Sequence, residues 1–162
     1  MKKVLIVSDT HGLEFGLFDV LAKEGEPDLL IHAGDTSGHE DRIRDMVNCA
    51  FKTVLGNNDY SPYLKYEEVF TFEGYRFFLT HGHREGVWSG TDRLVYKGLS
   101  EDANVIVYGH THIPSVEFDD EYGVWVVNPG SLTSPRQDGH RPSYIVMTIP
   151  EDGEPEFRIN FL

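Results

Sequence analysis

The sequence predicts an α/β fold in which two mixed β-sheets pack against each other with helices on the outside. In the first half, short apolar runs of strand length alternate with segments whose apolar residues recur at helical spacing. Such alternation predicts a parallel sheet with right-handed crossovers. The second half contains mainly strand-like runs, beginning with a hairpin, and these predict a second sheet of mixed direction.

The first half supplies three strands and two helices. The apolar run at 4–7 predicts the first strand, and the helical spacing at 14–23 predicts the first helix. A second strand at 29–31 precedes an amphipathic helix at 39–49, and a third strand follows at 53–55. Such continuous apolar runs are typical of parallel strands buried on both faces. The apolar stripe of the first helix comprises Phe15, Leu17, Phe18, Val20 and Leu21, and Ile43, Met46 and Val47 are expected to face inward from the second.

The second half begins with a tight hairpin, in which runs at 68–72 and 75–80 flank Glu73-Gly74. A helix is expected at about 89–102, because its apolar residues recur at helical spacing. No internal repeat or linker interrupts the chain, so residues 1–162 are expected to form a single domain. Further strands are expected at 105–108, 124–127, 144–149 and 157–161, with a surface turn at 152–155 before the last, which we expect at a sheet edge.

The composition is that of an ordinary globular protein, with 40% hydrophobic and 25% charged residues. The single cysteine, Cys49, excludes a disulfide framework and a thiolate metal cluster, and it fits a reducing cytoplasm. The basic and apolar start at 1–7 resembles a signal peptide, but the run breaks at Ser8, so a strand is the better interpretation. No apolar run is long enough to span a membrane, so no membrane partner is expected.

The formal net charge of −13 bears on the partners of the protein. Two bound divalent cations would add four positive charges and leave −9, which is still acidic. An acidic surface without a run of Lys or Arg repels the nucleic-acid backbone. We therefore expect no high-affinity nucleic-acid partner, although a short nucleotide substrate stays compatible with the sequence.

Five of the apolar runs lead directly into residues that commonly bind metals. Strands of one sheet end along a common edge, so these five ends can converge on one small volume. Carboxylate, carboxamide and imidazole groups together form the ligand set of a divalent metal centre. Glycines beside them permit tight turns and close approach of the backbone. The five segments are Ser8-Asp9-Thr10-His11, His32-Ala33-Gly34-Asp35, Gly56-Asn57-Asn58-Asp59, Thr80-His81-Gly82-His83 and Gly109-His110-Thr111-His112.

Each segment alone has a simpler structural explanation. Asp9 could cap the following helix, Gly34-Asp35 could form a turn, and Asn57 could adopt a left-handed backbone in a loop. His81 and His83 could be partly buried histidines at a strand end. The spacing of His110 and His112 is the most suggestive, because paired imidazoles are costly to hold together unless something binds them. The presence of all five at strand ends favours one shared site.

In this order, the five segments resemble the motifs of the calcineurin-like metallophosphoesterase superfamily. The chain length and the segment Asn128-Pro129-Gly130-Ser131 make the sequence similar to the small bacterial and archaeal phosphodiesterases of that superfamily. The resemblance covers nearly the whole chain. It implies a four-layer α/β/β/α sandwich of two mixed sheets with flanking helices, and a two-metal phosphoesterase site.

The resemblance also implies a role for each ligand position. Asp35 would bridge two divalent ions, which could be Mn²⁺, Mg²⁺, Fe, Ni²⁺ or Zn²⁺, because a donor set without thiolate does not choose among them. Small relatives often form homo-oligomers, so a homo-oligomer is compatible with the resemblance. The first ion would be held by Asp9, His11 and His112, and the second by Asn57, His81 and His110.

Two cations about 3.5–4 Å apart lower the pKa of a water between them and orient an ester for in-line attack. The expected reaction is therefore direct hydrolysis by a metal-bridging hydroxide, without a phospho-enzyme intermediate. Small phosphodiesters are the expected substrates, because the sequence suggests no extended basic groove. Mutation of Asp35 is expected to abolish activity and lower metal content together.

The sequence departs from the superfamily at Asn58. Many members have His there, which is thought to protonate the leaving alkoxide, whereas Asn58 can only donate a hydrogen bond to a phosphate oxygen. Either another group supplies the proton, with His83 the nearest candidate, or the enzyme depends on good leaving groups. His83 could instead be a supporting or surface histidine, and Asp59 a supporting or turn residue. The candidate catalytic residues are Asp35, Asn58 and His83.

Other residues have weaker claims to the site. His32 is expected to be a packed or supporting histidine, and His39 and His140 are expected to be solvated. Arg136 could contact a substrate phosphate or lie free on the surface. The aromatic residues Trp88 and Tyr63 are candidates for a substrate rim.

Two functions of other classes compete with the enzyme. Some relatives have lost metal ligands and serve as protein-interaction scaffolds, and a metal-binding protein without hydrolytic activity is the other alternative. All seven ligand positions hold residues able to bind a metal, which favours the enzyme, while Asn58 leaves the alternatives open. Metal content measured together with hydrolysis of an activated phosphodiester would separate the three.

Overall fold

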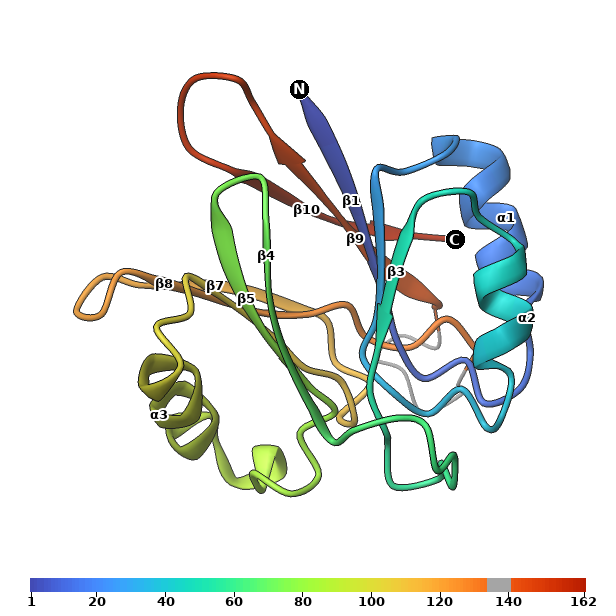
Figure 1. The fold of residues 1–162 in the computed structure, drawn as a ribbon, viewed down its shortest axis with the longest axis horizontal. Helices are drawn as coiled ribbons and strands as arrows, with labels where there is room; N and C mark the ends of the chain where they lie inside the picture. Colours follow the sequence, from blue (N-terminus) through green and yellow to red (C-terminus); the bar gives the residue numbers. More distant parts are fainter. Residues whose placement is uncertain (134–140) are drawn as a thin grey trace.

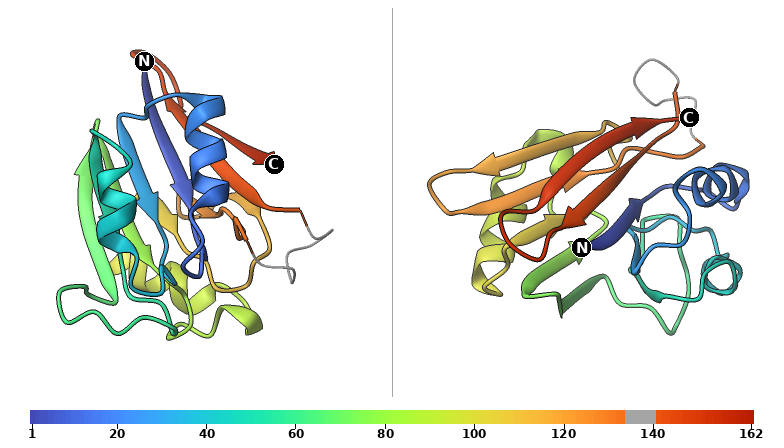
Figure 2. Two further views of the ribbon diagram at one scale, coloured as in Figure 1. Left: turned by 90° about the vertical axis from the view of Figure 1, so that its right-hand side faces the viewer. Right: turned by 90° about the horizontal axis from the view of Figure 1, so that it is seen from above.

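Two five-stranded β-sheets face each other in the computed structural model, which describes residues 1–133 and 141–162 (Figure 1). Helices α1 and α2 cover the outer face of one sheet, and α3 covers the outer face of the other (Figure 2). The predicted α/β fold, a four-layer α/β/β/α sandwich of two mixed sheets, is confirmed. Arg136 and His140 lie outside the described residues.

The first sheet has the strand order β10-β9-β1-β2-β3. Strands β1, β2 and β3 are parallel, as the alternation with helices predicted, while β9 is antiparallel to β1 and β10 to β9. The parallel carboxyl ends therefore lie at one edge. The strands are β1 (Lys2–Val7), β2 (Leu29–His32), β3 (Ala50–Thr53), β9 (Ser143–Ile149) and β10 (Glu156–Phe161).

The second sheet has the order β4-β5-β6-β8-β7. Strands β5, β6 and β8 are parallel, and β4 and β7 add antiparallel edges. The predicted hairpin is present, with β4 and β5 joined by Glu73-Gly74. The strands are β4 (Glu67–Phe72), β5 (Tyr75–Thr80), β6 (Val105–Val107), β7 (Ser115–Asp119) and β8 (Val124–Asn128).

The second and third helices are shorter than the sequence predicts. Helix α1 spans Phe15–Glu24, but α2 spans only Glu40–Asp45, because the next two backbone N–H groups bond to carbonyls three residues back and tighten the turn. The third helical segment divides into a 3₁₀ turn, η1 (Val87–Ser89), and α3 (Asp92–Ser100). None of the helices in the described ranges is both long and apolar enough to cross a membrane.

Three apolar layers hold the sandwich together. Alternate residues of β1 face opposite ways: Val4 and Ile6 pack between the sheets, and Leu5 and Val7 pack against α1 and α2. A third cluster joins the second sheet to α3. The predicted stripe of α1 is wrong at Phe15 and Phe18, which are 77% and 68% exposed, because the narrow contact with the sheet is filled by other residues of the helix.

Three expectations about the strands need correction. β3 is a partly buried edge strand that ends at Thr53, because the backbone N–H of Leu55 bonds to Lys65 instead of a neighbouring strand. Strand β7 was not predicted: Val116 and Phe118 alternate with polar residues, but the run is short and this edge strand has only these two apolar side chains. The five ligand-bearing strands belong to two sheets, three to the first and two to the second.

Candidate metal centre

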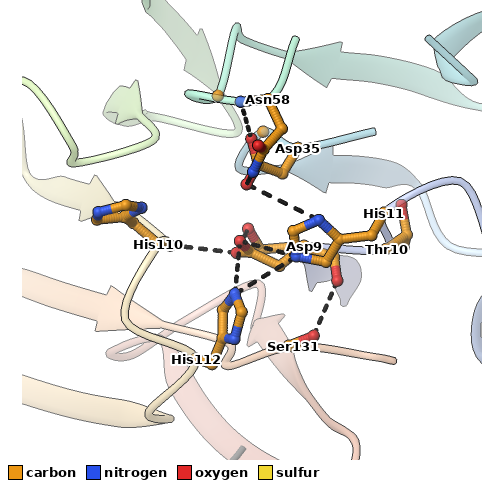
Figure 3. A network of polar contacts seen from close by, with 12 residues as sticks. Asp9, Thr10, His11, Asp35, Asn58, His110, His112 and Ser131 are labelled. Carbon is orange, nitrogen blue, oxygen red and sulfur yellow. Dashed lines mark hydrogen bonds and ion pairs between the residues drawn. The ribbon is translucent and has the colours of Figure 1, made fainter. Parts of the chain in front are cut away.

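Loops from five strands meet at one edge of the sandwich and bring the predicted ligand residues together (Figure 3). The loops after β1, β2 and β3 carry mainly oxygen donors, and the loops after β5 and β6 carry imidazoles. In Figure 3, the Asp9 side chain lies at the centre, with His110 and His112 on one side and His11 on the other. The packing of the two sheets therefore brings together mainly oxygen donors from the first sheet and imidazole donors from the second.

Asp9, His11 and His112 form the first group of side chains that could hold a metal ion. His112 Nε2 lies 3.0 Å from Asp9 Oδ1, and His11 Nε2 lies 3.7 Å from the same oxygen. The two Nε2 atoms are 3.4 Å apart. Three donor atoms thus face one small volume, as the sequence predicts for the first ion.

Asp9, Asp35 and His81 form the second group. His81 Nε2 lies 3.4 Å from Asp35 Oδ2 and 3.8 Å from Asp9 Oδ1, and Asn57 Oδ1 lies 3.0 Å from the same nitrogen. Asp35 Oδ2 is also 3.9 Å from His11 Nδ1. Both carboxylates therefore lie between the two groups, whereas the motifs imply this position for Asp35 alone.

His110 and His83 lie around His81. The His110 ring centroid is 5.1 Å from that of His81, and the His110 backbone N–H donates to Asp9 Oδ2 at 3.2 Å. The His83 ring centroid is 5.4 Å from that of His81, and its buried Nδ1 atom has no hydrogen-bond partner in the described part of the chain. Trp88, with its ring 6.3 Å from that of His110, is exposed at the rim.

Several of the candidate ligands hold a left-handed backbone themselves. Residues other than glycine rarely adopt this conformation, which costs on the order of 1 kcal/mol each. Such strain persists only where the surrounding structure enforces it, and it is typical of functional sites. From the sequence, this freedom is expected at the neighbouring glycines or at Asn57, whose φ is not positive. The φ angle is +55° at Asp9, +49° at His11, +61° at Asp35, +71° at His110 and +61° at His112.

Two glycines allow the loops to approach the carboxylates closely. A Cβ atom at Gly56 would overlap Oδ1 of Asp35, and a Cβ atom at Gly109 would overlap Ser8 and lie 2.7 Å from Asp9 Oδ2. The backbone of Gly56 is not left-handed, so glycine is needed there for space rather than for the backbone angle.

Asn58 and Asp59 hold Asp35 in place. Asn58 donates to both carboxylate oxygens of Asp35, from its backbone N–H at 2.9 Å and from Nδ2 at 2.9 Å. The Asp59 carboxylate accepts the backbone N–H groups of Asp35 at 2.7 Å, Gly56 at 2.8 Å and Ser37 at 2.8 Å. The loop after β3 is thus clamped onto the loop after β2, and Asp59 has the supporting position that the sequence left open.

The turn after β8 stabilises two further loops, a role that is not predicted from the sequence. Asn128 Nδ2 donates to the carbonyl of Gly109 at 3.1 Å and to Thr111 Oγ1 at 3.0 Å. Ser131 Oγ donates to the carbonyl of Asp9 at 2.8 Å. The available signal was that Asn128 ends a buried strand parallel to β6, so it falls at the same edge as the ligands.

The buried charges of the centre perturb one another. Burial raises the pKa of Asp9, but the hydrogen bond with His112 and the charge of His81 hold it below its usual value. Burial also raises the pKa of Asp35, but the hydrogen bond and the charge of His81 outweigh this effect, so the pKa of Asp35 lies below its usual value. Burial lowers the pKa of His81, but Asp35 and Asp9 raise it to about 9. An imidazolium thus balances the two carboxylates.

Two buried histidines have fixed hydrogen-bonding roles. His81 Nδ1 donates to the carbonyl of Ala33 at 2.7 Å, which leaves Nε2 directed at the carboxylates. His32 Nδ1 accepts the Gly34 N–H at 3.2 Å, so its Nε2 donates to Thr10 Oγ1 at 3.0 Å. Burial lowers the pKa of His32 to about 4, and the neutral ring packs under the loop after β1, as the sequence predicts for a packed or supporting residue.

The donor set fits divalent metal ions. Carboxylate, amide and imidazole donors without thiolate suit Mn²⁺, Mg²⁺, Fe, Ni²⁺ or Zn²⁺. Two buried carboxylates side by side also require a positive charge nearby. Within the described residues, no Lys or Arg pairs with Asp9 or Asp35, and only histidines do.

A model of the calcineurin-like phosphoesterase superfamily domain matches residues 1–152. The chain belongs to this superfamily. The resemblance of the motifs is thereby confirmed. Membership supports a phosphoester hydrolase that uses divalent metal ions, and the clustered Asp and His side chains agree with it.

Two bacterial relatives extend over most of this superfamily member. It is 35% identical over 150 residues to a probable metallophosphoesterase, YsnB, of Bacillus subtilis, which spans 92% of this chain and 85% of the relative. It is 30% identical over 169 residues to the phosphodiesterase YfcE of Escherichia coli, with 89% and 86% of the two chains covered.

Two solved structures share the architecture of this chain. A predicted phosphoesterase from Streptococcus pneumoniae aligns with a TM-score of 0.81 and 25% identity, covering 99% of this chain and 88% of the other. A Vps29 variant from Entamoeba histolytica aligns with a TM-score of 0.77 over 99% of each chain. Its 23% identity shows a common fold alone.

Proposed function

We propose that this calcineurin-like phosphoesterase is a binuclear phosphodiesterase that hydrolyses small phosphodiesters by in-line attack of an activated water. The observation that carries the proposal is the pair of donor groups that share Asp9 and lie around Asp35. The similarity to the phosphodiesterase YfcE of Escherichia coli supports a diester substrate, and the acidic charge of the chain favours a small substrate over nucleic acid. The lone thiol of Cys49 fits an enzyme of the reducing cytoplasm.

We assign the ligands as the motifs imply, with Asp35 as the bridge. The 3.0–3.7 Å separations around Asp9 Oδ1 support the first set, and the 3.0 and 3.4 Å approaches to His81 Nε2 support the second. Asp9 lies within 3.8 Å of His81 as well, so its carboxylate supports both positions. Asp9, His11 and His112 would hold one ion, and Asn57, His81 and His110 the other.

When bound, the two ions supply Lewis acidity, which makes a water nucleophilic at neutral pH and offsets the charge that builds on the phosphoryl oxygens. The chain itself fixes the geometry. Asn58 and Asp59 orient the Asp35 carboxylate, and Ala33 orients the His81 ring. Preorganised donors of this kind need no rearrangement during the reaction.

The leaving group departs without a general acid from Asn58, whose amide has no titratable proton. Its side chain is exposed and already bonds to Asp35, so it orients that carboxylate and faces the substrate side. Burial and the charge of His81 lower the pKa of His83, so that ring is neutral at physiological pH and a poor acid. These features favour phosphodiesters with good leaving groups.

Replacement of Asp35 tests the metal assignment. The Asp35→Ala variant is expected to lose hydrolysis of bis(p-nitrophenyl) phosphate and most bound metal together, because Asp35 belongs to the second donor group and is the proposed bridge between the two ions. Metal content is measured by elemental analysis and folding by circular dichroism. Full turnover by a folded Asp35→Ala protein would overturn the assignment.

A leaving-group series tests the second part of the proposal. Rates on phosphodiesters that differ only in leaving-group pKa are expected to fall steeply as that pKa rises, since no residue protonates the departing oxygen. The Asn58→His variant is expected to flatten the slope. A shallow slope in the wild type, lost in His83→Gln, would instead assign proton donation to His83.

The same measurements address the scaffold and the purely metal-binding alternatives. A scaffold would bind neither metal nor substrate, and a metal-binding protein would retain ions without hydrolysis. The donors present at all seven ligand positions favour the enzyme.

A further inference from the structure

A hollow of about 600 Å³ opens beside the candidate metal centre, between the start of α2 and the loop after β3. Ser37 and Asn58 line it from the two sides. Asn58 Nδ2 also donates to Asp35 Oδ2 at 2.9 Å, so the hollow and the metal centre share one wall. A diester whose phosphate lies at Asp35 can therefore extend one of its two arms across Asn58 into this hollow.

The loop that forms the outer wall has a fixed base and an aromatic tip. The backbone N–H of Leu55 donates to the carbonyl of Lys65 at 2.8 Å and closes the loop, and Asp59 ties it to the rest of the centre. Tyr60 and Tyr63 line the hollow and are 91% and 92% exposed. Rings that contribute so little to the core are available for a ligand, and the clamped base limits the entropy lost when one binds.

The opposite wall is acidic. Glu40 and Asp41, in the first turn of α2, line the same hollow. Glu40 Oε2 accepts the Thr36 hydroxyl at 3.0 Å, which directs its carboxylate. Asp41 forms an exposed ion pair with Arg44 at 3.6 Å, but no Lys or Arg occurs among the described residues that line the hollow. A positively charged group is attracted between these carboxylates and the tyrosine rings, whereas a second phosphate is repelled.

We propose that this hollow binds the alcohol arm of the phosphodiester substrate and selects an arm that carries an ammonium group. The inference rests on the proposed function for the place of the phosphate at Asp35. Tyr60 and Tyr63 offer aromatic faces to the cation, and Glu40 and Asp41 supply the opposite charge. The substrate class is a zwitterionic phosphodiester of an amino or quaternary ammonium alcohol.

Two matched diesters test the selection in the full-length, Mn²⁺-loaded protein. One is p-nitrophenyl phosphorylcholine, and the other is its 3,3-dimethylbutyl counterpart, which has the same leaving group and shape but no charge on the arm. The wild type is expected to show a kcat/KM about tenfold higher for the choline ester, as one desolvated cation–π contact allows. Equal kcat/KM values would overturn the inference.

Variants locate the selectivity in the hollow. Two double variants are each expected to bring the ratio of the kcat/KM value for the choline ester to that for the dimethylbutyl ester close to one. One variant is Tyr60→Leu with Tyr63→Leu, and the other is Glu40→Gln with Asp41→Asn. Tyr122→Leu with Glu121→Gln is the matched control, because it also removes an exposed tyrosine and an acid, at the opposite edge, and should leave the ratio at the wild-type value. A ratio that survives both hollow variants would overturn the inference.

A binding measurement separates this inference from the proposed function. Calorimetry is expected to show about tenfold tighter binding of phosphocholine, which carries the ammonium group, than of 3,3-dimethylbutyl phosphate. Preferential binding without hydrolysis of either diester would support the hollow and overturn the proposed phosphodiesterase. Hydrolysis of both diesters without preferential binding would support the phosphodiesterase and overturn the inference about the hollow. A preference for thymidine 5′-(p-nitrophenyl phosphate) would also overturn it and assign the hollow to a nucleobase.

Discussion

The two edges of the sandwich differ in which residues adopt a left-handed backbone. At the edge opposite the centre, the residues with a left-handed backbone in the turns between strands are mostly glycines, such as Gly74, Gly123 and Gly153. At the centre, it falls on candidate ligands such as Asp9, Asp35 and His110. A turn needs only the backbone angle, which glycine supplies without strain, whereas a metal centre also needs the side chain. Strain is therefore kept where a donor atom is required.

The two edges also differ in the space around their glycines. A Cβ atom at Gly56 would overlap the Asp35 carboxylate, whereas a Cβ atom at Gly74 or Gly123 would meet no other atom within 4 Å. Glycine at the centre thus serves close approach as well as conformation. The clamp formed by Asn58 and Asp59 depends on that approach.

A matched pair of glycine substitutions should give the largest contrast between the edges. Gly56→Ala is expected to lower phosphodiester hydrolysis by about 100-fold or more and to reduce metal content, since Asp35 must move. Gly74→Ala, at φ +82°, is expected to cost about 1 kcal/mol in free energy of unfolding and to leave activity unchanged. Similar effects of the two on hydrolysis would contradict the proposed difference.

Removal of the clamp should have the next largest effect. Asp59→Ala leaves three backbone N–H groups without their acceptor, so metal affinity is expected to fall by about 10- to 100-fold. Unfolding free energy should fall by about 1–3 kcal/mol. The control is Asp120→Ala, an exposed aspartate in the turn between β7 and β8, which should change neither quantity. Wild-type metal affinity in Asp59→Ala would rule out the clamp.

A pH titration should give the smallest effect, again confined to the centre. The folded pKa of His81, about 9, lies above the ordinary value of 6.5, so the stabilising imidazolium is fully present below pH 6.5. The metal-free protein should lose stability as pH rises from 6.5 to 9, while the lowered pKa values of Asp9 and Asp35 keep their contribution constant there. Urea unfolding at several pH values measures this loss, and His81→Gln should remove it.

Metal binding should show the reverse dependence over the same range. Because a metal ion and a proton compete for His81 Nε2, the apparent metal affinity should rise between pH 6.5 and 9. A metal affinity that is independent of pH in this range would show that His81 is not a ligand.

Much of the architecture and the candidate site could be predicted from the sequence. Parallel strands buried on both faces read as continuous apolar runs, and the residues that follow them are fixed by covalent connection. Asp9, Asp35 and His81 could therefore be found at strand ends. The predictions failed at element ends and on surfaces, as at α2 and at Phe15, where local spacing does not reveal what the neighbouring layer leaves uncovered. They also failed at β7, where the alternation is short and includes only two apolar residues.

By itself, the sequence determined the order of the elements and the chemical nature of the donors, because both depend on residues adjacent in the chain. Only the tertiary structure decided which donors face each other. Asp9 and His112 are 103 positions apart and come from different sheets, yet their side chains lie 3.0 Å apart. The approach of Asp9 to both donor groups likewise depends on how the two sheets pack. The clamp of Asp59 on Asp35 and the aromatic and acidic hollow beyond Asn58 depend on the pairing of β2 with β3 and on the position of α2. Packing is set by the shape of the whole core, which no local pattern records.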